Sequence, residues 1–125
     1  MRATMRPILI ALVAAALSAS DVHVTGIWRL TGRITDVAID RVCTIEQTGG
    51  KIQGPCKNQA GETVLSGEVN GDSISWKYEA KYDGATVVLV FKGTLESDLT
   101  MKGTITASDT AGNNTTTGTF TAKRQ

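Results

Sequence analysis

The chain has 125 residues, 13 basic and 12 acidic side chains, and a formal net charge of +1. The two signs are interspersed, which argues against the clustered lysines and arginines of a nucleic-acid-binding surface. With a single histidine and two cysteines, the chain also offers few ligands for a metal, and we expect neither a metal nor a cofactor.

The first twenty residues have the order of a secretory signal peptide. Arg2 and Arg6 precede an apolar run over residues 8–17, and small residues follow at 18–20. The apolar run is about half the roughly 20 residues that a membrane-spanning helix needs, so no membrane span is expected after cleavage. We expect cleavage after residue 20, a periplasmic or secreted location, and a single mature domain over residues 21–125.

After this segment, short stretches rich in Val, Ile, Thr and aromatic residues alternate with Gly, Asn and Asp turns, and no stretch has a helical stripe. Eight strands are expected, over residues 23–31, 41–48, 51–57, 62–69, 73–82, 85–95, 99–108 and 114–123. Eight is a number that closes an up-and-down barrel. The sequence therefore predicts an all-β fold: an eight-stranded antiparallel up-and-down β-barrel with one disulfide.

The disulfide is expected between Cys43 and Cys56, the only cysteines, because an exported chain meets an oxidising compartment. A two-residue turn at Gly49-Gly50 places these two cysteines opposite each other on neighbouring strands. Pro55 cannot donate a ladder hydrogen bond and predicts local fraying there. The alternative, a metal clip, is disfavoured because His23 lies far away in sequence.

The turn sequences predict which residues oppose each other. Asn70-Gly71 is a two-residue hairpin signal that sets Leu65 opposite Trp76, and Asp83-Gly84 sets Trp76 opposite Phe91. A three-residue loop at 96–98 and a turn at 112–113 set a register that keeps the apolar residues of the last two strands on the same face.

The face that these turns define as inner carries the large apolar residues. The expected inward and ligand-contacting residues are Arg41, Thr63, Trp76, Tyr78, Tyr82, Leu89, Phe91, Ile105 and Phe120. Residues 31–40 are the longest connection at the open end and are expected to act as a lid. Whether Arg41 faces inward, and whether the inward glycines make room for a ligand or for the aromatic rings, stays open at this stage.

Gly26-Ile27-Trp28 opens the first strand and Lys123-Arg124 ends the last. This pattern resembles the lipocalins and calycins, and most of all small exported bacterial lipocalin-like proteins. The resemblance implies that Gly26 allows close approach, that Trp28 plugs the barrel floor, and that Arg124 or Lys123 lies over the indole ring. A fainter likeness runs to periplasmic inhibitors of metalloproteases, which are disulfide-bonded barrels that open with Gly-x-Trp.

These features favour a protein, monomeric or homodimeric, that binds a small apolar or amphipathic molecule in its lumen. The polar end of the site would carry Arg41, Tyr78 and Tyr82, which are also the candidate catalytic residues if the barrel is instead a cofactor-free isomerase, cyclase or lyase. A third hypothesis is a protein-binding module, such as a protease inhibitor acting through residues 21–25 or the mouth loops. A barrel filled by its own side chains is the remaining alternative.

Overall fold

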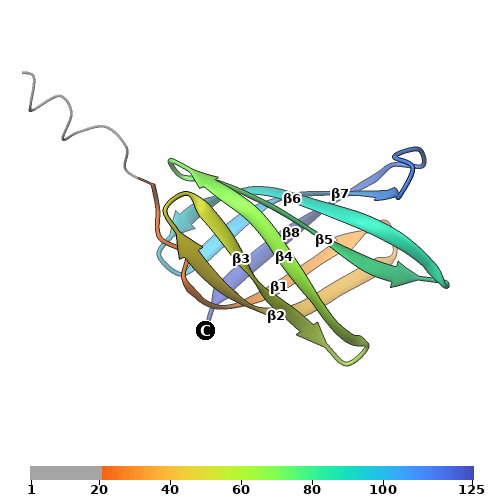
Figure 1. Cartoon of the computed structure of the whole chain (residues 1–125), viewed down its shortest axis with the longest axis horizontal. Helices are drawn as coiled ribbons and strands as arrows, with labels where there is room; N and C mark the ends of the chain where they lie inside the picture. Colours follow the sequence, from red (N-terminus) through yellow and green to blue (C-terminus); the bar gives the residue numbers. More distant parts are fainter. Residues whose placement is uncertain (1–20) are drawn as a thin grey trace, which may run out of the picture.

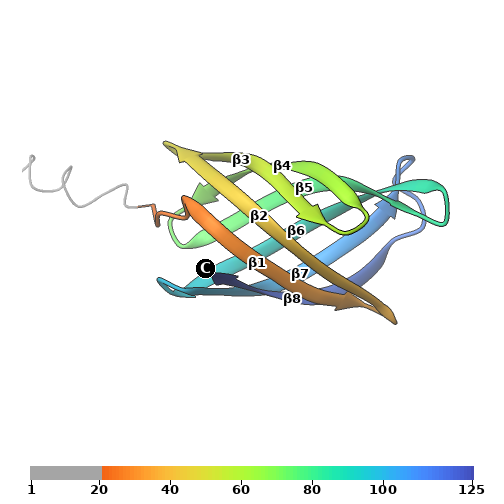
Figure 2. The ribbon, with the colours of Figure 1, turned by 90° about the horizontal axis from the view of Figure 1, so that it is seen from below.

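The computed structural model describes residues 21–125, which form one closed antiparallel barrel (Figures 1 and 2). Its strands, each paired with the next and the last with the first, are β1 (Gly26–Ile34), β2 (Val37–Thr48), β3 (Lys51–Asn58), β4 (Gly61–Asn70), β5 (Ser73–Tyr82), β6 (Ala85–Ser97), β7 (Thr100–Asp109) and β8 (Thr116–Arg124). The predicted fold class is confirmed. The expected signal peptide lies outside the described residues, and among those described no helix is long and apolar enough to cross a membrane.

The expected lid at residues 31–40 is wrong. Residues 26–34 and 37–48 are strands, joined by a tight turn at Thr35-Asp36, and Ile34 pairs with Val37. This turn contains no Gly or Asn, and Thr35 adopts a φ of 53°, a left-handed conformation that is uncommon for a β-branched residue. The Thr35 hydroxyl donates a 2.6 Å hydrogen bond to the Ile34 carbonyl. Because the sequence signal for a hairpin was missing, the strands on either side were predicted too short.

The predicted register is correct at Asp83-Gly84, where Trp76 opposes Phe91. It is wrong by two residues at the preceding hairpin, where Trp76 opposes Gly67 and not Leu65. Gly71, with a φ of 67°, occupies the first central position of that turn, the glycine position of a type II′ turn rather than a type I′ turn. A shift of two residues leaves every side chain on its predicted face.

The last two connections also differ from the prediction without changing the faces. A β-bulge between Leu95 and Ser97 shortens the expected loop at 96–98, so that β6 continues to Ser97 and pairs there with Thr100. The connection before β8 runs over residues 110–115 and is longer than the predicted turn at 112–113, and Phe120 opposes Gly103. Ile105 and Phe120 are buried inside the barrel as expected.

One end of the barrel is closed by contacts around Trp28. The indole is buried and its Nε1 donates a 2.9 Å hydrogen bond to the Val24 carbonyl. Arg124 lies over the indole, with Cζ 4.6 Å from the ring centroid, and its guanidinium donates to the carbonyls of His23, Thr25 and Asp98. A Cβ at Gly26, whose φ is 148°, would stand 3.1 Å from Arg124 Nη1, so glycine lets the guanidinium approach the backbone.

The disulfide between Cys43 and Cys56 lies inside the barrel, with the two Cα atoms 4.0 Å apart. It stands beside a gap in the β2–β3 ladder, because the paired residues jump from Cys43 and Cys56 to Glu46 and Gln53. Pro55, which has no N–H to donate, lies in that gap. The covalent bond thus holds the two strands together where backbone pairing is interrupted.

Replacing both cysteines by alanine is expected to lower the free energy of unfolding by about 2 to 4 kcal/mol, because the cross-link no longer restricts the unfolded chain. Urea unfolding followed by tryptophan fluorescence measures the change. The reduced wild-type protein is the control, because it lacks the cross-link but keeps both sulfur atoms in the core. A loss below roughly 0.5 kcal/mol in both forms would contradict this role.

Candidate functional site

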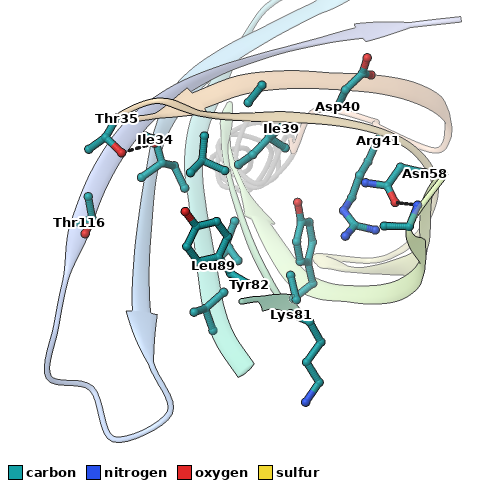
Figure 3. A pocket seen from close by; sticks show the side chains of 16 residues that line it. Ile34, Thr35, Ile39, Asp40, Arg41, Asn58, Lys81, Tyr82, Leu89 and Thr116 are labelled. Carbon is teal, nitrogen blue, oxygen red and sulfur yellow. Dashed lines mark hydrogen bonds between the residues drawn. The ribbon is translucent and has the colours of Figure 1, made fainter. Parts of the chain in front are cut away.

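A cavity of about 340 Å³ opens at the end of the barrel opposite Trp28 (Figure 3). β1, β2, β5 and β6 form most of its wall, and the β3–β4 turn and the start of β8 complete it. The apolar part of the wall consists of Ile34, Val37, Ile39, Ala80, Val87 and Leu89. The polar part includes Thr35, Arg41, Asn58, Tyr78, Tyr82 and Thr116. A concave site with apolar walls and a few placed polar groups is the usual form of a small-molecule site.

Arg41 faces into this cavity, which answers the question that the sequence left open. Its side chain is half-buried, and Cζ lies 5.3 Å from the centre of the Tyr78 ring. The guanidinium has one long contact, 3.5 Å from Nη1 to the Cys56 carbonyl. That distance is beyond the usual range for an N–H···O hydrogen bond, so the five N–H donors of Arg41 are poorly satisfied by the described protein groups.

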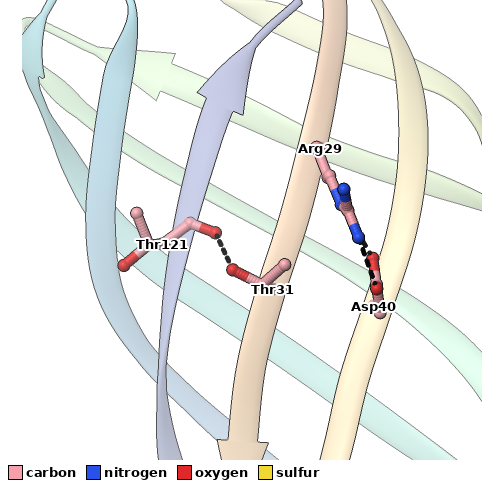
Figure 4. Close-up of polar contacts among 4 residues, drawn as sticks. All are labelled: Arg29, Thr31, Asp40 and Thr121. Carbon is pink, nitrogen blue, oxygen red and sulfur yellow. Dashed lines mark hydrogen bonds and ion pairs between the residues drawn. The ribbon is translucent and has the colours of Figure 1, made fainter.

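The neighbouring Asp40 is turned away from Arg41. Side chains alternate along a strand, and Asp40 forms an ion pair with Arg29 on the outer surface, with 2.8 Å between Nη2 and Oδ2 (Figure 4). The hydrogen bond from Arg29 holds the pKa of Asp40 below its usual value. The Asp40 carboxylate is therefore engaged outside the barrel and does not neutralise Arg41.

Tyr78 lies below Arg41 in the barrel and is only 3% exposed. Its hydroxyl has no hydrogen-bond partner among the described residues. Burial raises the pKa of Tyr78 to about 12, and Arg41 acts in the opposite direction without overcoming it, through its charge and as a nearby donor to the phenol oxygen. Such a contact leaves the Tyr78 O–H itself without an acceptor. Tyr78 is thus a protonated, unpartnered donor at neutral pH, on the wall of the cavity.

The remaining polar candidates divide between the cavity and its surroundings. Tyr82 lines the cavity at the rim and is 52% exposed. Thr63 does not line it, contrary to the prediction. Backbone pairing between β4 and β5 stops at Ser66 and Lys77, and beyond that point the Thr63 hydroxyl donates a 2.8 Å bond to the Glu79 carbonyl. Thr63 therefore bridges two diverging strands instead of facing a ligand.

Four of the apolar candidates form a packed layer below the cavity. Trp76 stacks on Phe91 with ring centroids 5.1 Å apart, Phe120 meets both rings edge-on, and Ile105 is fully buried among the core residues. None of the four lines the cavity, whereas Leu89 does. These four residues therefore do not line the cavity, contrary to the expectation, because the aromatic rings fill the barrel at this level, and ligand contact by Leu89 stays a prediction.

Two inward glycines, Gly67 and Gly93, let neighbouring strands approach closely. A Cβ at Gly67 would collide with the Ser75 carbonyl and the Trp76 backbone on β5, and one at Gly93 with the Lys102 carbonyl on β7. The Cβ at Gly93 would also lie 2.9 Å from the Phe120 Cζ, so this glycine in addition makes room for a ring of the aromatic layer.

Several wall residues, mainly those of the β1–β2 hairpin, were not predicted from the sequence. Val37 and Ile39 continue the inward alternation back from Arg41, and Ile34 continues that of Trp28 and Leu30, but all three were assigned to a loop. Extending the period of two through residues 28–34 and 37–41 would have found them. Asn58 and Thr116 come from a turn and a strand end, where no periodic signal exists.

The amino-terminal segment, residues 21–25, lies across the closed end. Val24 is fully buried and its N–H donates a 2.8 Å bond to the Gln47 side chain, while Asp21 Oδ1 accepts a 2.7 Å bond from the Gly71 N–H. The Val22 N–H donates to the Gly71 carbonyl. The segment that the inhibitor hypothesis used as a free arm is therefore attached to the barrel.

Charged and metal-ligating groups are otherwise sparse in the cavity. Lys81 is on its wall, with Nζ 2.6 Å from the Thr86 hydroxyl. Within residues 21–125, no three His, Cys, Asp or Glu side chains gather where they could hold a metal ion.

No protein-family model matches the sequence. No curated protein matches it either. Solved structures resemble the fold, among them the following two. One is a structure of EF1p2_mFAP2b bound to DFHBI, with a TM-score of 0.59 and 16% identity over 80% of this chain and 92% of that chain. The other is a redesigned β-barrel, b11L5F_LGL, with a TM-score of 0.55 and 14% identity over 80% of this chain and 90% of the other. These likenesses show the barrel fold, which is consistent with a lipocalin-like architecture, and they do not assign the chain to a family.

The raised pKa of Tyr78 predicts a measurable alkaline titration. In a Tyr82→Phe variant, Tyr78 is the sole tyrosine. Its ultraviolet phenolate absorbance should appear with a midpoint near pH 12, compared with 10.0 for an unperturbed phenol. Because the unfolded chain loses this proton first, the free energy of unfolding should be unaffected below pH 10 and fall by roughly 2 to 3 kcal/mol as the pH rises to 12. Ionisation near pH 10, with the circular dichroism of the barrel intact, would contradict the buried environment.

Proposed function

We propose that the protein is an exported binding protein that holds a small apolar or amphipathic molecule in the cavity at its open end. The observation that carries this proposal is the arrangement of the wall, in which apolar side chains face the half-buried Arg41 and the buried hydroxyl of Tyr78. A cavity of about 340 Å³ is near the lower bound of the 300 to 1,000 Å³ typical of ligand pockets, which favours a compact ligand over a long lipid.

The comparison with solved structures supports the same reading. EF1p2_mFAP2b, which has a similar barrel fold, is bound to DFHBI in its structure. In this protein the aromatic layer of Trp76, Phe91 and Phe120 confines the available space to the mouth. A ligand would therefore bind above that layer and be partly accessible from the rim.

A cofactor-free enzyme that uses the same cavity is the second candidate, and Tyr78 is the observation in its favour. A phenol whose pKa is raised to about 12 stays protonated at neutral pH and would donate a hydrogen bond to an oxygen that gains negative charge. The Tyr78 hydroxyl would thus be the hydrogen-bond donor both in binding and in catalysis. The protease-inhibitor hypothesis has less support, because residues 21–25, one of the two parts through which it would act, are packed on the barrel floor; for the other, the mouth loops, it stays a prediction.

Ligand retention tests the binding proposal. We expect the mature protein, purified gently from its host, to carry a small molecule in native mass spectrometry. A Val87→Phe variant, which adds a bulky ring on the cavity wall, should lose that molecule. The matched control is Val64→Phe, because Val64 is 60% exposed on the outside of β4. Equal retention in the two variants would contradict a site in the cavity, and a bare wild-type barrel would count against a tightly bound ligand.

Export is part of the proposal and rests on the order of charged, apolar and small residues over 1–20, together with the buried disulfide. In a Gram-negative host, the full chain should yield a periplasmic protein that begins at Asp21 and gains about two protons in mass on reduction. An Ala14→Arg variant, which places a charge in the apolar run, should stay in the cytoplasm uncleaved. Recovery of wild-type protein in the cytoplasm with residues 1–20 attached would contradict export.

A further inference from the structure

The polar part of the cavity contains donors that lack acceptors. Arg41 carries N–H groups with one long contact, and the Tyr78 hydroxyl has no partner among the described residues. Asn58, exposed at the rim, adds a further donor, because its side-chain oxygen accepts a 2.9 Å hydrogen bond from the Ala60 N–H and its amide nitrogen remains able to donate to a ligand. Figure 3 shows Arg41 and Asn58 on the same side of the cavity.

The charges around the cavity add to this preference for an acceptor. Asp40 is held outside by Arg29, and Figure 3 shows it pointing away from the cavity while Arg41 extends into it. Lys81 also lies next to the cavity, but it alternates to the exposed outer face of β5 and donates to the Thr86 hydroxyl there. Arg41 is therefore the charged group that faces the cavity, and a half-buried guanidinium requires an anionic or carbonyl group to offset its lost hydration.

We propose that the cavity selects small molecules that carry one carboxylate on a compact apolar body, with the carboxylate bound by Arg41 and the Tyr78 hydroxyl. This inference rests on the proposed binding function and specifies its ligand class. The planar guanidinium matches the two oxygens of a carboxylate, and the hydroxyl can donate to one of them. The apolar body then contacts Ile39, Val87 and Leu89 on the wall.

The experiment compares three probes with one carbon skeleton: phenylbutyrate, phenylbutyramide and phenylbutylamine. Isothermal titration calorimetry of the mature, ligand-free protein measures each affinity. Phenylbutyrate should bind at least about tenfold more tightly than the amide, which is the order of effect of a charge-assisted hydrogen bond. The amine should bind most weakly, because its cation meets Arg41.

Arg41→Gln should abolish the preference for the acid by lowering its affinity about tenfold or more, while the affinity for the amide changes by less than about twofold. Arg33→Gln is the matched control, because it removes the same charge from the exposed outer face of β1 and should preserve the preference. Tyr78→Phe keeps the buried ring and tests the hydroxyl separately, with an expected loss of roughly three- to tenfold for the acid alone.

Three results would overturn the inference. Equal affinity for acid and amide would show that the cavity does not select carboxylates. An unchanged preference in Arg41→Gln would show that Arg41 does not bind the carboxylate, and either of these two results would leave the proposed binding function standing. Failure of all three probes to bind would overturn the inference and, for ligands of this size, the proposed function as well.

Discussion

An eight-stranded sheet encloses a lumen only when its first and last strands pair, and both the core and the cavity depend on this closure. Here β1 pairs with β8 from Trp28 opposite Arg124 to Ile34 opposite Gly118. At the closed end, Arg124 lies on Trp28 and donates to the carbonyl of Asp98 in the β6–β7 turn, so one cation joins the two terminal strands to a third part of the barrel. Within residues 21–125, closure confines unpaired strand edges to places where neighbouring strands diverge, such as β4 and β5 beyond Ser66 and Lys77.

The interior that closure creates is divided into two levels with different roles. At the lower level Trp76, Phe91 and Phe120 pack against one another, and Gly93 leaves room for the Phe120 ring. Such close packing excludes water and ligand and supplies the hydrophobic stability of the fold. At the upper level the lumen stays open as a cavity of about 340 Å³. Tyr78 lies at the boundary, where its ring contacts Phe91 and its edge reaches the cavity.

The sequence predicted the inner face of the barrel far better than its turns, and the reason is the period of two. An error of two residues in a hairpin, as at Gly71, moves the cross-strand partners but leaves each side chain on its face. The β1–β2 hairpin was missed because Thr35 supplies the turn without glycine or asparagine. The candidate site was predicted in part: alternation placed Arg41 and Tyr78 inward. It could not show that packed rings remove Phe91 from the site, because that depends on how side chains fill a three-dimensional space.

The boundary between the two levels is also where the protein gives up stability. An unpartnered buried hydroxyl costs roughly 1 to 3 kcal/mol of folding free energy, and phenylalanine at position 78 would fill the same space without that cost. A half-buried guanidinium with one long contact adds a further cost, since the acid beside it in sequence is engaged by Arg29 on the outer surface. Packing of the barrel requires neither group, because the aromatic layer below is complete without them. A ligand with acceptor oxygens would accept hydrogen bonds from both groups at once. Binding would then recover the free energy that the folded protein loses by burying these donors without acceptors.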